Sequence, residues 1–215
     1  QQVIRSIPNP VISSAMHCMA HEEGAHPCLS QKSVPVILGV GELSKRKNFH
    51  YLVQSFALLR RRIPCRLLIL GEGKQRESLL NEARKRDIEK DVILPGYVTN
   101  PYKHMRLADL FVLTSRYEGF SIVLAEALGL GLPVVSVDCP NGPREILQNG
   151  AYGELVPLDA PKELADAMYR CLLTPPDPQK QKQGARPFSI EKSVTKYLYA
   201  LGLTEAPEAD TDVVN

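Results

Sequence analysis

The stretch from Asp109 to Pro133 constrains the fold most, because it holds a strand pattern, a loop and a helix pattern in direct succession. Residues 110–113 are all apolar and do not alternate with polar residues, which is typical of a strand buried on both faces. Residues 121–130 are rich in Leu, Ala and Glu and predict a helix that ends at the glycines following it. A second apolar run at 134–137 predicts the next strand, so the stretch indicates a parallel sheet with helices on its faces.

The same alternation of apolar runs and helical stripes continues along most of the chain. Further strands are predicted at 34–40, 66–70, 92–94 and 153–157, and further helices at 48–62, 75–86, 101–107, 161–173 and 189–201. We therefore expect an α/β fold, a single doubly wound sheet of about six parallel strands within residues 34–203. Such sheets bind ligands at the carboxyl ends of their strands.

The remaining segments lack these patterns. We expect residues 1–33 to be an irregular, linker-like segment, and the Pro- and Gln-rich residues 175–187 to be a linker or a mobile arm. Residues 204–215 are acidic and predict a disordered tail. Since the sequence begins with Gln1 and a linker-like segment, we expect it to be a piece of a longer protein.

Composition excludes several classes of function. A net charge of +2, from 26 basic and 24 acidic residues, gives no field strong enough to predict nucleic acid as a partner. The five cysteines lie far apart without a C-x-x-C pair, which argues against a disulfide framework or a zinc ribbon and favours a reducing cytoplasm. No apolar run approaches the roughly 18 residues of a membrane span.

A crowded set of possible metal ligands lies near the amino terminus. Its members are His17, Cys18, His21, His26 and Cys28. Their spacing fits no standard zinc finger, so we expect no metal site there.

The loop between the strand at 110–113 and the following helix carries the main candidate site. Backbone N–H groups at a helix start have no partner within the helix, and the helix dipole there favours anions. These groups belong to Gly119, Phe120, Ser121 and Ile122, and Gly119 has no Cβ to keep a ligand away.

Two carboxylates flank this helix start. Glu118 precedes it, and Glu126 falls on the helical face of Ile122, where a carboxylate suits a ribose diol. The stretch therefore predicts a site for a nucleotide-linked ligand. In the alternative interpretation, Glu118 only complements the helix dipole and Glu126 is an exposed helix charge.

The sequence around this loop resembles a known family. The run T-S-R-Y-E-G-F-S-I-V-L-A-E-A-L-G-L-G-L-P-V-V-S-V-D-C-P-N-G-P-R-E-I-L is similar to the signature region of the family-four (group 1) retaining glycosyltransferases of GT-B fold. The similarity extends from about Asn9 to Tyr197. It implies a Rossmann-like domain equivalent to the carboxyl-terminal half of such an enzyme. It also implies that Glu118 lies beside the donor sugar and that Glu126 binds the donor ribose.

The resemblance extends to the basic loop after the first strand, with one departure. The family has a G-R-x4-K pattern there, whose Arg and Lys hold the donor diphosphate. Lys47 matches the Lys, but Glu42 stands at the Arg position, and a carboxylate cannot grip a diphosphate. Either Arg46 or Lys45 supplies the missing charge, or Glu42 meets a sugar hydroxyl or Lys47 instead.

Two further loops follow predicted strands. In the family, the loop that contains Gly96 and Tyr97 meets the nucleotide base through its backbone, and Tyr97 either stacks on a ligand or packs on the protein. The glycines of residues 71–73 form either a phosphate-binding turn or a simple strand-to-helix turn.

The resemblance implies an enzyme, a retaining hexosyltransferase, with no tightly bound cofactor and no metal. Its donor substrate is a nucleotide sugar, most commonly a uridine diphosphate (UDP) sugar. Its acceptor is a glycan or a lipid-linked glycan in polysaccharide biosynthesis. An amino-terminal acceptor domain outside this chain completes the site, and the whole protein is cytoplasmic or peripheral at the inner face of the membrane.

Other functions remain to be weighed. A non-catalytic nucleotide-sugar-binding or interaction module of the same fold is favoured only by Glu42. A glycoside hydrolase with Glu118 and Glu126 as its acid and nucleophile fits badly, because carboxylates at a loop and on a helix do not flank one bond. Residues 210–212 match the D-x-D of metal-dependent transferases of another fold but follow no strand.

Overall fold

One six-stranded parallel sheet organises the molecule. The computed structural model describes residues 7–205. The strands are β1 (Val36–Val40), β2 (Arg66–Leu70), β3 (Val92–Gly96), β4 (Leu110–Leu113), β5 (Val134–Val137) and β6 (Glu154–Val156). Their order is β3-β2-β1-β4-β5-β6, and every pairing is parallel. This confirms the predicted α/β fold, and the order reverses between β1 and β4, where such sheets form their ligand crevice.

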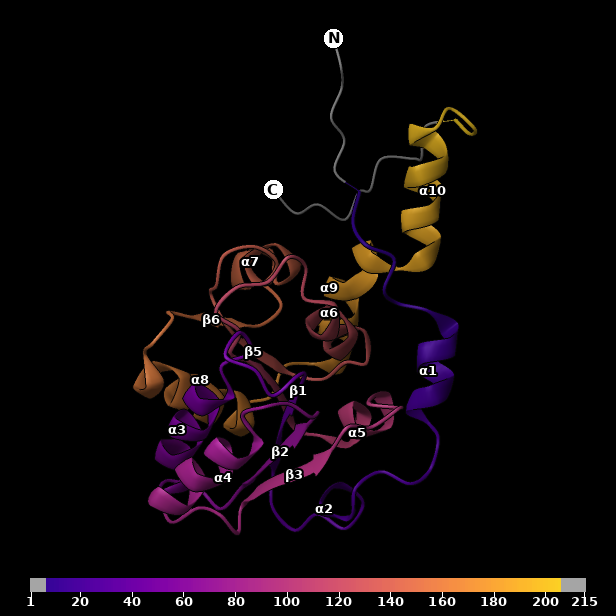
Figure 1. Cartoon of the computed structure of the whole chain (residues 1–215). Helices are drawn as coiled ribbons and strands as arrows, with labels where there is room; N and C mark the ends of the chain where they lie inside the picture. The colour runs from indigo at the N-terminus through magenta and orange to yellow at the C-terminus, as the bar shows by residue number, and fades with distance from the viewer. Residues whose placement is uncertain (1–6, 206–215) are drawn as a thin grey trace.

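Helices cover both faces of the sheet (Figure 1). The α-helices are α1 (Ser14–Ala20), α2 (Pro27–Ser30), α3 (Phe49–Arg60), α4 (Arg76–Lys85), α5 (Tyr102–Leu107), α6 (Ile122–Gly129), α7 (Pro143–Ile146), α8 (Pro161–Leu173), α9 (Pro178–Ala185) and α10 (Ile190–Ala200). One face packs on α3, α4 and α8, and the other on α2, α5, α6 and α7. Successive β1 residues serve opposite faces, Ile37 the first and Leu38 the second, which explains the apolar runs without alternation.

The segment expected to be irregular and the one expected to be a linker or a mobile arm both contain helices. Within residues 1–33, α1 is capped by Ser13, whose side chain accepts a hydrogen bond from Met16 N, and α1 packs against α5. In the Pro- and Gln-rich segment, Asp177 caps α9 in the same way, and α9 packs against α6. The expectation of irregular structure was wrong there, because capping and tertiary packing stabilise helices too short to form alone. Residues 206–215, including the D-x-D match, lie outside the described residues.

The last helix stands away from the body of the domain (Figure 1). Its base is joined to the amino-terminal segment, because Ile190 N donates to Ile12 O over 3.0 Å and Ser193 Oγ donates to Pro8 O over 2.9 Å. Val194 and Tyr197 are each 45% exposed on its outer part. Within residues 7–205, none of the helices has the length and apolar character needed to cross a bilayer.

Candidate functional site

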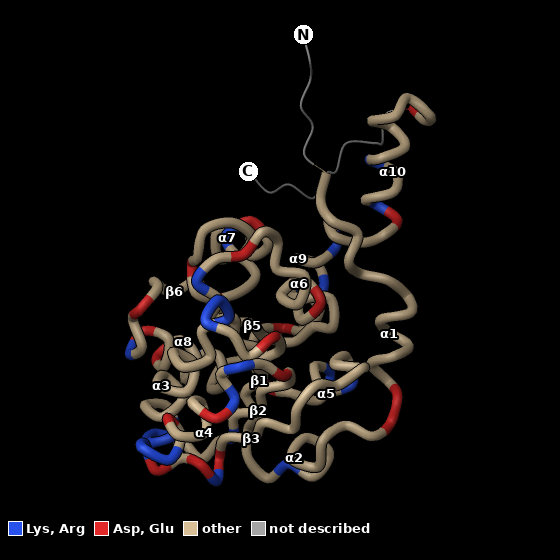
Figure 2. The backbone as a smooth tube through the Cα atoms, in the orientation of Figure 1, with Lys and Arg blue, Asp and Glu red and all other residues tan. Residues whose placement is uncertain are grey.

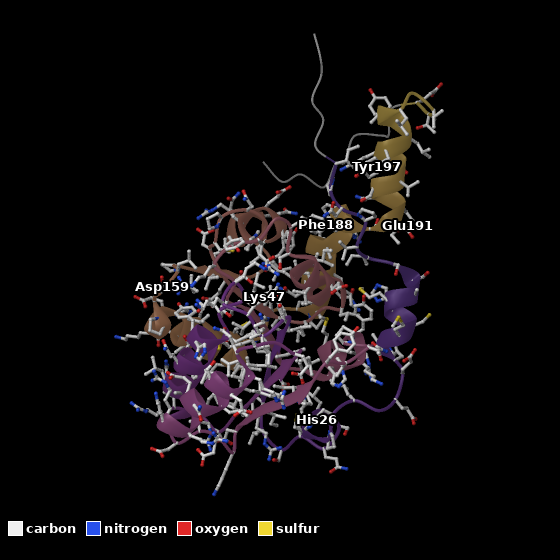
Figure 3. The ribbon with its side chains drawn as sticks, viewed as in Figure 1. His26, Lys47, Asp159, Phe188, Glu191 and Tyr197 are labelled. Carbon is white, nitrogen blue, oxygen red and sulfur yellow. The ribbon has the colours of Figure 1, made fainter. Side chains whose placement is uncertain are left out.

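Two loops meet at the carboxyl ends of the central strands β1 and β4. One joins β1 to α3 and contains Lys47, which Figure 3 labels near the middle of the molecule. The other joins β4 to α6 and contains Glu118. Arg116 N donates to Arg46 O over 2.8 Å, and Thr114 Oγ1 donates to Lys47 O over 3.0 Å. These bonds fix the two loops against each other, so that their side chains share one site.

Glu118 is the centre of this site. It is buried, and both of its carboxylate oxygens accept hydrogen bonds. Lys47 Nζ donates to Oε1 over 2.8 Å and Ser115 Oγ donates to the same oxygen over 2.6 Å. Arg46 Nη1 donates to Oε2 over 3.0 Å. The structure thus brings the predicted pair Glu118 and Lys47 into direct contact.

The surroundings of Glu118 keep it ionised. Burial raises the pKa of its carboxyl group, but hydrogen bonds from Lys47 and Ser115 and the charges of Lys47 and Arg46 outweigh burial, so the pKa lies below its usual value. Figure 2 shows the charged positions along the backbone; at this site two cations, Lys47 and Arg46, pair with a single carboxylate.

The backbone at the start of α6 is open on the side of Gly119. Gly119 is exposed, and a Cβ built on it would meet no atom within 4 Å, so the backbone there is accessible. Phe120 turns its ring inward, and its centroid lies 5.4 Å from that of Phe188. Ser121 is buried, and its Oγ has no hydrogen-bond partner among the described residues. Ile122 is 52% exposed, so its side chain is not part of the hydrophobic core.

Glu126 has a partner that the sequence did not indicate. Tyr102 of α5 donates its hydroxyl proton to Glu126 Oε1 over 2.9 Å. Burial raises the pKa of Glu126 and the hydrogen bond from Tyr102 partly offsets it. Burial, together with the charge of Glu126, raises the pKa of Tyr102 to about 12. One oxygen of Glu126 is therefore already engaged, and Glu126 is not the exposed charge of the alternative interpretation.

A cavity of about 470 Å³ opens at the carboxyl ends of β1, β2 and β3. Its lining includes Glu42, Glu72, Tyr97 and Val98. Tyr97 is 74% exposed, so packing on the protein does not account for it. Gly96 is not among the lining residues, and a Cβ there would lie 2.7 Å from Glu72 Oε1. The structure thus places the predicted base loop at a cavity, with Glu42 on the cavity wall.

The glycines of residues 71–73 have a structural reason. A Cβ on Gly71 would lie 1.9 Å from Gly41 O, and one on Gly73 would lie 2.5 Å from Leu43 O. Both residues also have positive φ angles, 144° and 156°. Close contact with the loop after β1 therefore favours the strand-to-helix turn over the phosphate-binding turn.

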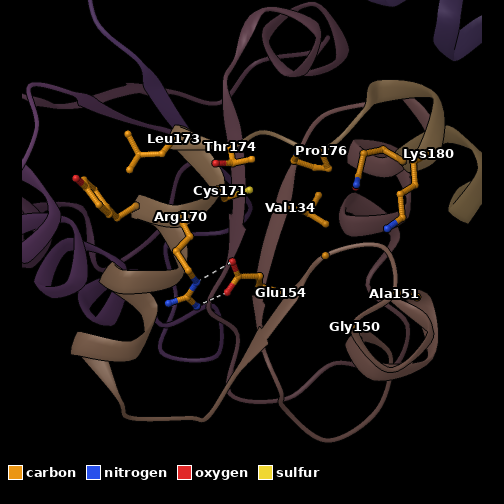
Figure 4. A pocket seen from close by; sticks show the side chains of 13 residues that line it. Val134, Gly150, Ala151, Glu154, Arg170, Cys171, Leu173, Thr174, Pro176 and Lys180 are labelled. Atoms are coloured by element: carbon orange, nitrogen blue, oxygen red, sulfur yellow. Dashed lines mark hydrogen bonds and ion pairs between the residues drawn. The ribbon is translucent and has the colours of Figure 1, made fainter.

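A second cavity, of about 490 Å³, lies at the opposite ends of the strands (Figure 4). Its lining includes Val134 and Glu154, the first residues of β5 and β6, and Arg170, which forms an ion pair with Glu154. It is separate from the Glu118 site. Within residues 7–205, no group of three or more His, Cys, Asp or Glu side chains is arranged to hold a metal ion.

This chain belongs to the group 1 glycosyl transferases, because the sequence model of that family matches residues 27–188. Its fold is that of one half of a GT-B glycosyltransferase.

One relative is the N-acetylgalactosamine-N,N'-diacetylbacillosaminyl-diphospho-undecaprenol 4-alpha-N-acetylgalactosaminyltransferase of Campylobacter jejuni, 34% identical over 169 residues, or 75% of this chain and 46% of the relative. A solved structure of Anabaena HepE in complex with UDP has a TM-score of 0.73 against this chain at 21% identity. The match covers 82% of this chain and 50% of that one. The apo form of the lipopolysaccharide outer core galactosyltransferase WaaB has a TM-score of 0.71 at 25% identity, covering 80% and 50%. The chain spans about half the length of these proteins.

Proposed function

We propose that this chain is the donor-binding domain of a retaining glycosyltransferase. It binds a nucleotide-diphospho-sugar, a UDP-sugar, and presents the sugar for transfer to a glycan or lipid-linked acceptor. The observation that carries this proposal is the ionised Glu118 held between Lys47 and Arg46 beside the open start of α6. The name of the Campylobacter relative, which includes a diphospho-undecaprenol, supports a lipid-linked acceptor in glycoconjugate or polysaccharide biosynthesis.

Each group then has a chemical task. Negative charge develops on the nucleoside diphosphate as it leaves, and Lys47 together with the backbone N–H groups of 119–122 stabilises that charge. Glu118 accepts hydrogen bonds from sugar hydroxyls and favours positive character at the anomeric carbon. The free oxygen of Glu126 accepts a hydrogen bond from the ribose. The nucleotide base occupies the cavity beside Tyr97 and meets the backbone near Gly96.

The acceptor side of the reaction requires a second domain. The chain spans about half the length of its relatives, and the Glu118 site lies at the carboxyl ends of the central strands β1 and β4. We infer that this chain binds the donor but transfers sugar poorly alone.

A non-catalytic module of the same fold is the second candidate. Glu42 favours it, because a carboxylate at this position weakens the diphosphate site that the family pattern implies. Engagement of Glu118 by Lys47 and Arg46 favours an active donor site instead.

Isothermal titration calorimetry with UDP tests donor binding by the 215-residue chain. We expect binding in the micromolar to millimolar range, and no detectable binding at millimolar UDP would contradict the proposal. Turnover of UDP-sugars by the longer natural protein, compared with its Glu118→Ala variant, separates an enzyme from a binding module. The anomeric configuration of the product, read by NMR, tests retention.

A further inference from the structure

Positive charge around Glu118 exceeds what that carboxylate neutralises. Lys47 and Arg46 each bring one positive charge to opposite oxygens of a single negative group. Ser115, the third partner, is neutral. One unit of positive charge therefore remains beside the start of α6, where the helix dipole adds to it. Such a site attracts an anion.

We infer that Arg46 is the second cation of the donor diphosphate site, in place of the arginine that the family pattern has at the position of Glu42. The inference rests on the proposed function. It assigns a ligand contact to a residue outside the matched pattern, and it explains how a chain with Glu42 keeps two cations at the site.

Glu42 takes no part in this charge cluster. It lines the neighbouring cavity together with Glu72; Glu72 is paired with Arg76, whereas Glu42 has no ion pair among the described residues. A diphosphate is repelled from that side and attracted to the side of Lys47. Among the described residues, no hydrogen bond or ion pair joins Glu42 to Lys47, whose Nζ donates to Glu118 instead.

Arg46 has the exposure that a ligand contact needs. Its side chain is 35% exposed, whereas that of Lys47 is 11% exposed. Within the described part of the chain its guanidinium makes a single hydrogen bond, from Nη1 to Glu118. The remaining N–H groups of the planar fork are free to donate to phosphate oxygens, the geometry for which arginine is suited.

The backbone holds Arg46 in place. Its carbonyl oxygen accepts from Arg116 N, which fixes the residue to the loop that carries Glu118. Lys45, the neighbouring cation, is exposed and forms no ion pair among residues 7–205. Of the two residues that could replace the missing arginine, only Arg46 contacts the site.

The test is calorimetry of the 215-residue chain with UDP, UMP and uridine. We expect Arg46→Gln to weaken UDP binding by about tenfold to hundredfold, as loss of a charged hydrogen bond does, and to leave uridine binding unchanged. Arg46→Lys should recover part of the loss, because it keeps the charge without the fork. Lys45→Gln is the matched control, and we expect a change within about twofold, since an exposed charge is screened.

A second background separates a direct contact from an effect through Glu118. In the Glu118→Gln chain, Arg46 has no carboxylate to neutralise, so an added Arg46→Gln change should still weaken UDP binding if Arg46 contacts phosphate. Loss of the Arg46→Gln effect in that background would overturn the inference.

The remaining outcomes are equally decisive. The Arg46 assignment would be overturned if Arg46→Gln bound UDP within about twofold of the unaltered chain, or if Lys45→Gln weakened UDP binding more than Arg46→Gln does. Either result would leave donor binding itself intact. Failure of the unaltered chain to bind UDP would refute the proposed function, and the inference with it. Circular dichroism of each variant shows whether the fold is kept.

Discussion

Replacing Ser115 by Ala tests how the protein keeps Glu118 charged. Ser115 is fully buried, and its hydroxyl donates to Glu118 Oε1 over 2.6 Å. A hydrogen bond to a charged group contributes about 1.5–3 kcal/mol, so Ser115→Ala should lower the free energy of unfolding at pH 7 by about that amount. For a chain of this size, each kcal/mol corresponds to about 2–4 °C in the thermal midpoint.

The loss should depend on pH. The pKa of Glu118 is lowered in the folded chain, so its contribution is fully present above the unfolded-state value of about 4.3 and is lost as the pH falls through the folded-state pKa. Ser115→Ala removes one of the bonds that lower the pKa. The difference between the two chains should therefore be largest near pH 7 and shrink below about pH 4.

Urea unfolding between pH 3.5 and 8, followed by circular dichroism, measures this difference. Ser136→Ala is the matched control, because Ser136 is equally buried but donates to a neutral acceptor, Val137 O. Ser136→Ala should lower the free energy of unfolding by less, about 0.5–1.5 kcal/mol, and by the same amount at every pH. A Ser115→Ala loss below about 0.5 kcal/mol, or one that does not change with pH, would refute the reasoning.

Two further predictions concern other contacts. Tyr102→Phe removes the hydrogen bond that partly offsets the raised pKa of Glu126, so the pKa of Glu126 should rise further. NMR titration of the Glu126 carboxyl carbon measures that pKa, and an unchanged titration would argue against the prediction. As the pH is lowered, the affinity for UDP should begin to fall at a higher pH than in the unaltered chain. Gly71→Ala places a Cβ within 1.9 Å of Gly41 O and should lower the free energy of unfolding in urea by more than about 3 kcal/mol. Gly150→Ala is the control, because Gly150 has a φ of 97° but open space around its Cβ, and it should lower that free energy by only about 1 kcal/mol. Equal losses in the two variants would show that the clash at Gly71 is relieved.

The sequence predicted those parts of the fold that depend on local pattern. Every residue of the runs at 110–113 and 134–137 is buried, and all of them except Ser136 are apolar. A strand that is covered on both faces has this pattern, whereas a strand with one exposed face alternates apolar and polar residues. The loops after β1 and β4 could be placed together because carboxyl ends of parallel strands share one edge of the sheet. This is why the contact between Lys47 and Glu118 agrees with the predicted site, while the roles of both residues stay predictions.

Contacts that depend on tertiary packing could not be predicted. Tyr102 reaches Glu126 across 24 positions of sequence, and the match depends on how α5 and α6 pack on the sheet. Ser115 lies only three residues before Glu118, so the pair was visible in the sequence. The hydrogen bond between them could not be predicted, because it depends on the conformation of the loop. The cap at Asp177 followed by Pro178 was also a readable helix start, and the high Pro and Gln content hid it.

The joint between the amino-terminal segment and α10 has a mechanical consequence. Ser193 Oγ donates to Pro8 O, Ile190 N donates to Ile12 O, and Val11 N donates to Phe188 O, where the amino-terminal segment lies beside the base of α10 (Figure 1). The bridge between Ile12 and Ser189 is parallel, so a force that pulled residues 7 and 205 apart would load its backbone bonds together, in shear. In an optical-tweezers experiment, this joint should yield before the sheet does, because only a few bonds hold it, whereas ladders of bonds hold the six strands.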